Sequence, residues 1–354
     1  MSSSRHEAHG ESPSPFESSR PVIVCGVDQS EHCRRALRVG AELAERLDSQ
    51  LVLVNVRPSP ADLPPGMAAE IGIARERAVE GGRRLFAELG DELVSEPSSR
   101  PLLKCVRARV EFGEPAAALN AVADELRASM IVVGARGRGA AGAALLGSVS
   151  QNLAAERSRP LLVVPPEADV AGSGVGEARS ASIVCGVDGS PSATEAVRVA
   201  GWLAAALGLR LVLVHVEQEG DEVSTGTMDF DILLGSDTRP RLRLLHRAVE
   251  AAGRAEVEVR LASGSAATAL EDVAARESAE LIAVGTRGHG AVKALVLGSV
   301  SRALAASGSR PVLIVNERLS RDCDGVHHPA APDPGMGAGA PERTAERPCR
   351  GRPR

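Results

Sequence analysis

Aromatic residues are nearly absent from this chain of 354 residues, which has four Phe, one Trp and no Tyr. Its hydrophobic cores must therefore be aliphatic, and a surface on which nucleic-acid bases stack against aromatic rings is excluded. With a net charge of −5, the chain also lacks the basic excess that favours nucleic acid or an anionic membrane. We expect neither as a partner.

Long apolar runs and paired cysteines are missing as well. No apolar run approaches the roughly 18 residues of a membrane span, and the N-terminus lacks the apolar core of a signal peptide. The six cysteines include no C-x-x-C pair, so we expect reduced thiols and a cytoplasmic protein. Cys25 and Cys185 are expected to act as small buried hydrophobes. We expect no metal site, because Cys323 and His327-His328 have no fourth ligand at a suitable spacing.

The chain does have a repeated glycine motif, G-x2-G-x9-G-S. Its residues are Gly134, Gly137, Gly147 and Ser148 in the first copy and Gly285, Gly288, Gly298 and Ser299 in the second. In both copies an apolar run that predicts a buried strand precedes the motif, and an amphipathic helix follows it. A strand, a glycine loop and a helix start can hold phosphates, because unpaired N–H groups and the positive end of the helix dipole point at the anion.

The repetition extends beyond this motif to two units of domain size. Cys25-Gly-Val-Asp28 recurs as Cys185-Gly-Val-Asp188. The two copies differ by nine residues in length, and we place this difference in the loop and helix start after the second strand. The sequence predicts domains at residues 21–167 and 181–317, a linker at 168–180, and disordered tails at 1–20 and 318–354.

Strand and helix patterns alternate within each unit. In the first, strands are predicted at 22–27, 51–56, 104–110, 130–133 and 160–164, with helices starting after Ser30 and at 77–89, 115–126 and 149–156. Ser190-Pro191 gives the matching helix start in the second unit. The fold class is therefore α/β, with two tandem doubly wound sandwich domains, each containing a five-stranded parallel sheet.

Other chemical motifs fit less well. Residues 137–142 satisfy the dinucleotide pattern G-x-G-x-x-G, but they follow the fourth strand, and Lys293 replaces the third glycine in the second copy. No Walker-type P-loop occurs, and no catalytic Ser–His–Asp or Cys–His set recurs in both copies. His215 stands where the first copy has Asn55, which we interpret as a position that tolerates variation.

The glycine motif and the two Gly-Val-Asp segments closely resemble the ATP-binding branch of the universal stress protein family, in its tandem-domain type. The resemblance implies an adenine nucleotide alpha hydrolase-like fold, with ATP and Mg²⁺ bound at the carboxyl ends of the strands. It also implies that the last strands, 161–164 and 312–315, pair the two domains with each other or with those of a second chain.

The resemblance further implies a role for each site residue. Asp28 and Asp188 would approach the ribose and adenine, and the backbone of Val56 and Val216 would read the adenine edge. The phosphates would be held by the glycines and serines of the motif, together with the helix-start N–H groups of Val149 and Val300. The remaining site residues are Gly26, Gly186, Arg136 and Arg287.

Alternatives remain open at several of these positions. The aspartates can be turn or capping residues, and the glycines can form a tight strand–helix turn without a ligand. Arg136 and Arg287 either reach a phosphate or are solvated surface arginines. Gln29 replaces the glycine found at 189, while Arg138 against His289 and Gly142 against Lys293 make the two loops unequal.

Three functions compete. The first is a regulatory ATP-binding stress protein that acts through an unknown protein partner. The second is a slow ATPase or nucleotidyl-transfer enzyme, for which neither loop supplies a catalytic base. The third is a nucleotide-free dimerising scaffold, which two intact glycine loops disfavour.

Overall fold

The computed structural model describes residues 21–59, 68–95, 106–137, 146–156, 159–168, 181–217, 240–287 and 297–317. The predicted tails, residues 169–180 of the predicted linker, Gly288 and the loop differences at 138, 142, 289 and 293 lie outside these ranges, as do Cys323 and the two tail histidines.

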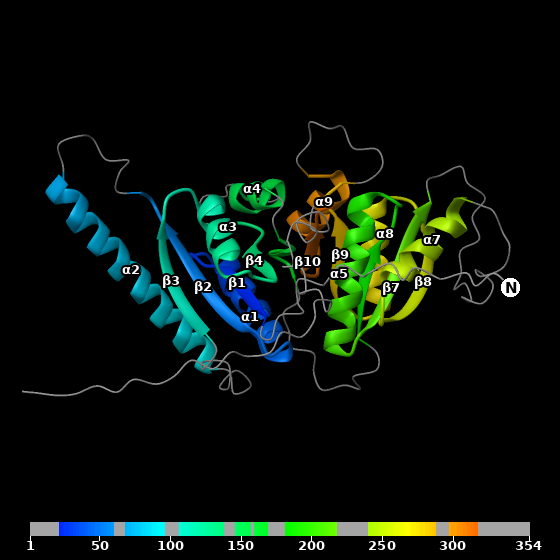
Figure 1. Ribbon diagram of the computed structural model, residues 1–354, viewed down its shortest axis with the longest axis horizontal. Coiled ribbons are helices and arrows are strands. Elements are labelled where there is room, and N and C mark those ends of the chain that lie inside the picture. Colours follow the sequence, from blue (N-terminus) through cyan, green and yellow to red (C-terminus); the bar gives the residue numbers. More distant parts are fainter. Residues whose placement is uncertain are drawn as a thin grey trace, which may run out of the picture.

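One mixed sheet runs through the described part of the chain (Figure 1). The first domain contributes β1 (Val22–Gly26), β2 (Gln50–Arg57), β3 (Val106–Phe112), β4 (Met130–Gly134) and β5 (Leu161–Val164). The second contributes β6 (Ser182–Gly186), β7 (Arg210–Glu217), β8 (Glu256–Ser263), β9 (Ala279–Gly285) and β10 (Val312–Val315). The strand order is β3-β2-β1-β4-β5-β10-β9-β6-β7-β8.

Within each domain the strands are parallel, as predicted, and the two halves join through an antiparallel pair. Leu162 of β5 lies opposite Leu313 of β10, so the intramolecular pairing implied by the family resemblance is confirmed. Each of these two strands also pairs with its own domain on the other side. No free edge is left on β5 or β10 for a second chain, so a homodimer through these strands would have to break existing pairing.

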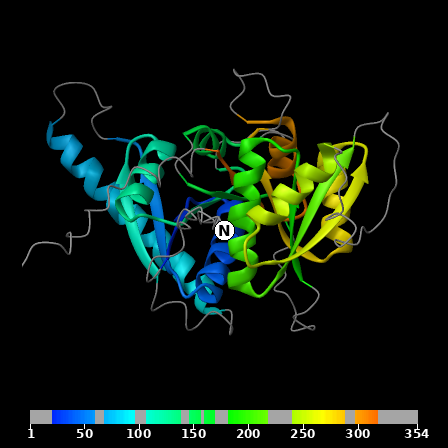
Figure 2. The same cartoon turned by 45° about the vertical axis from the view of Figure 1, so that its right-hand side comes forward.

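Helices cover both faces of the sheet (Figure 1, Figure 2). One aliphatic core lies under α1 (Glu31–Arg46), α2 (Ala68–Ser95), α5 (Pro191–Leu207) and α7 (Pro240–Ala251). The other lies under α3 (Pro115–Glu125), α4 (Ser148–Glu156), α8 (Ala266–Arg276) and α9 (Ser299–Ser307). Among the described residues, no helix combines the length and apolar character needed to cross a bilayer.

The predicted helix starts are confirmed. Ser30 caps α1 by accepting a hydrogen bond from the Cys33 N–H at 3.2 Å. Ser190 caps α5 in the same way from the Ala193 N–H, and Pro191 occupies the first turn, where its missing N–H costs nothing. These caps determine where the chain turns from β1 and β6 into helix, just after Asp28 and Asp188.

The predicted helix at 77–89 is too short. In the structure α2 begins at Ala68 and has 28 residues, whereas the described helix α7 has 12. The N-terminal part of α2 extends beyond the sheet (Figure 1), and its Ile73 is 51% exposed. Apolar periodicity reports burial, so a solvated helical extension leaves no such signal.

Polar contacts also cross the boundary between the domains. Arg46 Nη1 lies 2.5 Å from Glu280 Oε2, with both side chains partly exposed. Burial raises the pKa of the neighbouring Glu42 carboxyl; Arg46 acts to lower this pKa and Glu280 to raise it. Because such a half-exposed ion pair contributes only about 0–1 kcal/mol, the apolar β5–β10 seam must provide most of the cohesion.

Candidate functional site

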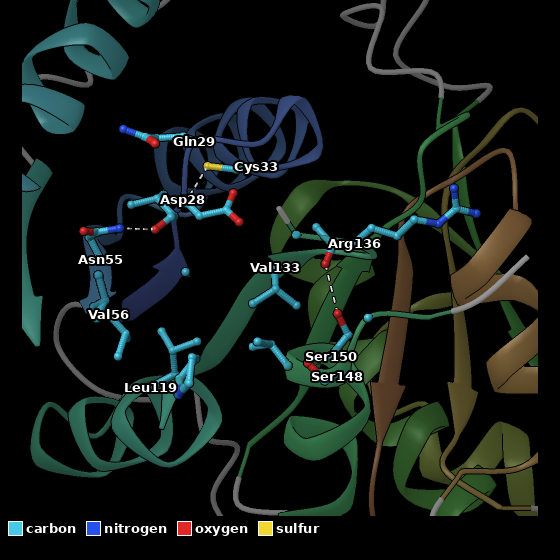
Figure 3. Close-up of a pocket in the computed structure, with 18 of the residues that line it drawn as sticks. Asp28, Gln29, Cys33, Asn55, Val56, Leu119, Val133, Arg136, Ser148 and Ser150 are labelled. Atoms are coloured by element: carbon cyan, nitrogen blue, oxygen red, sulfur yellow. Dashed lines mark hydrogen bonds between the residues drawn. The ribbon is translucent and has the colours of Figure 1, made fainter. Parts of the chain in front are cut away.

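A cavity of about 570 Å³ opens at the carboxyl ends of β1, β2 and β4 in the first domain (Figure 3). The structure brings together all nine residues that the sequence singled out in this domain. They are Gly26, Asp28, Val56, Gly134, Arg136, Gly137, Gly147, Ser148 and Val149. These residues come from segments far apart in the chain, and the parallel sheet unites them because its strands end at the same edge.

The Asp28 carboxylate divides its two oxygens between two tasks. Oδ1 accepts hydrogen bonds from the Ser30 N–H at 2.8 Å and the Ser30 hydroxyl at 2.5 Å, so it holds the turn into α1. Oδ2 would lie 2.9 Å from a Cβ built on Gly137, so it faces the start of the glycine loop. The role of Asp28 as a turn residue therefore accounts for Oδ1, whereas Oδ2 lies on the side of the cavity.

The glycines around the cavity also differ in what they do. A Cβ on Gly134 would lie 2.9 Å from the His32 carbonyl oxygen, and one on Gly26 would lie 3.0 Å from Leu119 Cδ1. Close approach of the α1 backbone therefore requires glycine at 134, whereas a Cβ at position 26 would press on the Leu119 side chain of α3. Among the described residues, a Cβ on Gly137 would meet the carboxylate of Asp28 and no backbone atom, so close backbone packing does not require a glycine there.

The start of α4 supplies the N–H groups predicted at the cavity, with one correction. The Gly147 N–H donates to the Ala135 carbonyl at 2.7 Å, so it holds the loop closed and is not directed at a ligand. The first bond from α4 back to the motif is donated by the Gln151 N–H to the Gly147 carbonyl at 3.0 Å. The N–H groups of Ser148 and Val149 precede that bond, in the first turn, where helical N–H groups lack intrahelical partners.

The side chain of Arg136 does not point into the cavity. Its Nη2 donates to the Ala306 carbonyl at 3.4 Å, near the end of α9 in the second domain, and Figure 3 shows the guanidinium directed toward that domain. Neither sequence-based interpretation anticipated this position. Arg136 lines the cavity but directs its charge to the domain boundary.

The second domain carries its predicted residues at equivalent places. Gly186, Val216 and Gly285 lie at or near the ends of β6, β7 and β9, while Gly298, Ser299 and Val300 begin α9. Asp188 Oδ1 accepts from the Ser190 N–H at 2.9 Å, as Asp28 does from Ser30. The Gly298 N–H donates to the Thr286 carbonyl at 2.8 Å, which repeats the closure made by Gly147.

One difference separates the two copies at the loop start. The Ser190 and Ser192 hydroxyls donate to the Arg287 carbonyl at 3.1 and 2.5 Å, and this ties the loop to the first turn of α5. The first domain has His32 at the position of Ser192. Arg287 itself keeps a buried Nε without a hydrogen-bond partner among the described residues.

Two pairs of residues that the sequence did not single out support the site. Asn55 Nδ2 donates to the Val27 carbonyl at 2.8 Å, and His215 Nδ1 donates to the Val187 carbonyl at 2.9 Å. The two side chains hold the Gly-Val-Asp segment in the same way, so this position tolerates the exchange of asparagine for histidine but has a supporting role that the sequence did not reveal. The available signal was chemical: both asparagine and histidine offer an N–H donor at similar reach.

The second pair is Ser150 and Ser301. The Ser150 hydroxyl donates to the Gly134 carbonyl at 3.0 Å, and the Ser301 hydroxyl donates to the Thr286 carbonyl at 3.3 Å. Each serine lies two residues after the motif's own serine, and this common spacing was a signal in the sequence. The bonds fasten the helix that follows the loop to the end of the strand that precedes it.

The cysteines near the site are buried. Cys25 and Cys185 are fully buried, as predicted. Cys33 lines the cavity and accepts a hydrogen bond from the Asp28 N–H at 3.2 Å. Burial raises the pKa of the Cys33 thiol to about 12, which makes it a poor nucleophile at neutral pH.

Comparison with known proteins gives consistent matches over both domains. The model of the universal stress protein family matches residues 20–165 and 181–316. A universal stress protein of Mycobacterium tuberculosis strain H37Rv is 28% identical over 298 residues, covering 83% of this chain and 97% of the relative. A second, from strain CDC 1551, is 29% identical over 319 residues, covering 85% and 96%. The crystal structure of a universal stress protein from Archaeoglobus fulgidus has a TM-score of 0.55 at 20% identity and covers 84% of this chain and 98% of its own.

Proposed function

The chain belongs to the universal stress protein family, and we propose that it is a regulatory protein in which each domain binds ATP. The observation that carries the proposal is the meeting of all nine predicted residues of the first domain in one cavity of about 570 Å³. This volume lies within the range of roughly 300–1,000 Å³ that is typical of small-molecule sites.

The walls of the cavity suit the parts of a nucleotide. Val56, Leu119 and Val133 face the same space (Figure 3) and offer an apolar surface for the adenine. Oδ2 of Asp28, which faces the start of the glycine loop, can accept from a ribose hydroxyl, since a carboxylate oxygen is a strong acceptor. The start of α4 can hold the phosphates through its N–H groups and the helix dipole.

Mg²⁺ is part of this proposal as a companion of the phosphates. In the described part of the chain, no three His, Cys, Asp or Glu side chains cluster as a metal site would require. Mg²⁺ is commonly held by substrate phosphates and water with only one or two carboxylates, so the ion would arrive with ATP.

We favour regulation over catalysis because the proposed pose places no base or carboxylate beside the phosphates at the start of α4. Phosphoryl transfer needs a base or a metal-binding carboxylate near the γ-phosphate, and Asp28 belongs to the nucleoside side of the proposed pose. Occupancy would instead alter the surface offered to an as yet unidentified protein partner. A cytoplasmic location fits Cys25, Cys33 and Cys185, which are free thiols.

Isothermal titration of the full chain tests the proposal. We expect about two ATP per chain, one in each domain, and a phosphate-release rate far below the enzyme median of about 10 s⁻¹. No detectable heat at millimolar ATP would overturn nucleotide binding. Ordinary enzymatic turnover would favour the alternative of an ATPase or nucleotidyl-transfer enzyme.

Asp28→Asn should weaken ATP binding in the first domain by about tenfold to a hundredfold. The substitution leaves an Oδ1 acceptor for Ser30 but replaces the charged oxygen that faces the cavity, and a hydrogen bond to a charged group contributes about 1.5–3 kcal/mol. The measurement is titration in a chain whose second loop is blocked by Gly298→Val.

Asp272→Asn is the matched control, because it removes the same charge from an exposed position on α8. The control should leave affinity and melting temperature unchanged. If Asp28→Asn bound ATP as tightly as the control, Asp28 would be a turn residue only.

A further inference from the structure

A second cavity, of about 540 Å³, lies in the second domain between α5, α7 and the loop after β6. Its lining residues are Val187, Gly189, Thr194, Arg243, Leu244, Arg247 and Ala248. The α5 and α7 helices cover the face of the sheet opposite to α8 and α9. The cavity in the first domain is also lined by the corresponding loop, through Val27 and Gln29, but it extends to residues of α3 and α4, on the face that corresponds to α8 and α9.

The charge of this second cavity is positive and is not neutralised within the described residues. Arg243 and Arg247 are exposed, lie one turn apart on α7 and both line the cavity. Among the described residues, neither guanidinium has a carboxylate within ion-pair distance. The nearest acidic groups on the two helices have other partners: Glu195 pairs with Arg198 at 2.5 Å, and Glu250 lies 3.4 Å from His246.

The first domain treats the same region differently. There Arg34 and Arg38 of α1 each lie 3.1 Å from Glu92 of α2, so the charges between the two helices are balanced. Thr194 replaces Arg34 in the second copy, four residues after the capping serine in both. The second domain has therefore exchanged an internal ion-pair cluster for two open arginines beside a cavity.

We propose that this cavity, hereafter the α5–α7 site, binds a phosphate-bearing anion independently of the ATP sites. Two guanidinium groups one helical turn apart can grip neighbouring phosphate oxygens with paired N–H donors. Gly189 has a φ of +82°, so the loop passes beside the cavity in a conformation that a side chain would disfavour. The Thr194 hydroxyl donates to the Ser190 carbonyl. As a neutral side chain, it does not neutralise the two arginines. Asp188 is the nearest acidic side chain of the loop, and its Oδ1 accepts from the Ser190 N–H.

Pyrophosphate is the probe for the α5–α7 site. In the full chain carrying Gly137→Val and Gly298→Val, which block the proposed ATP sites, we expect about one pyrophosphate per chain at low ionic strength, where exposed charges are least screened. Adding Arg243→Gln and Arg247→Gln should weaken this binding at least tenfold. The control carries Arg77→Gln and Arg83→Gln instead, at exposed positions of α2 outside either cavity. This control should bind pyrophosphate as tightly as the parent.

Hydrogen–deuterium exchange on the unblocked chain covers the case in which the loop variants do not fold. Without added nucleotide, pyrophosphate should slow exchange in residues 240–251 of the unblocked chain but not of the Arg243→Gln/Arg247→Gln variant. The proposal is overturned if pyrophosphate neither titrates nor protects this helix, or if the arginine variant responds like its parent. Failure of ATP binding alone would leave the pyrophosphate result intact, so the two proposals fail separately.

Discussion

Replacing Gly137 and Gly298 together by valine should reduce the ATP bound per chain from about two to none, with the far-UV circular dichroism unchanged. A Cβ on Gly137 would lie 2.9 Å from Asp28 Oδ2, the one neighbouring atom within 4 Å among the described residues. The valine would therefore enter the space between the glycine loop and Asp28, which is where the proposal puts ATP. On Gly298 a Cβ would lie 3.2 Å from the Thr286 carbonyl, so the loop at the start of α9 must shift.

The single substitutions should each halve the stoichiometry measured by isothermal titration. Gly90→Val is the matched control, because a Cβ on Gly90, in α2, meets nothing within 4 Å. Full stoichiometry in the double variant would mean that ATP binds elsewhere. Loss of the helical signal would mean that these glycines are structural.

Gly201→Ala should lower the stability of the second domain by about 3 kcal/mol, at the upper end of what overpacking costs. A Cβ on Gly201, in the middle of α5, would lie 2.3 Å from the carbonyl oxygen of Ala252. Backbone atoms cannot rotate away as a side chain can, so the end of α7 would have to separate from α5. We expect the melting temperature of this domain to fall by roughly 5–10 °C.

Gly40→Ala in α1 is the matched control, and its effect on stability should have the opposite sign. A Cβ there would have Leu51 Cδ1 as its nearest neighbour, at 3.7 Å, which is an ordinary contact. Alanine in a helix interior is about 1 kcal/mol more favourable than glycine, so this variant should melt at or above the parent temperature. If both substitutions destabilised the chain equally, close approach of α7 would not be the reason for Gly201.

The sheet was predictable because its signals are local. Continuous apolar runs such as 22–27 and 130–133 predict strands buried on both faces, and β1 and β4 are found there. The caps at Ser30 and Ser190 were readable for the same reason, since a cap needs only its next few residues. The outer turns of α2 were not readable, because their described side chains, such as the half-exposed Ile73, are mostly solvent-exposed and need not be apolar.

The candidate site shows the same division between local and tertiary information. By itself, the sequence determined that this is a duplicated α/β protein with a glycine-rich loop at the end of the fourth strand of each copy, because the spacing of glycines and the duplication are properties of the chain alone. Only the tertiary structure decided the direction of the Arg136 side chain, the shared hydrogen-bonding role of Asn55 and His215, and the exposure of the two arginines at the α5–α7 site. Each of these depends on which distant backbone or side chain lies opposite, and such neighbours are determined by how the helices pack on the sheet.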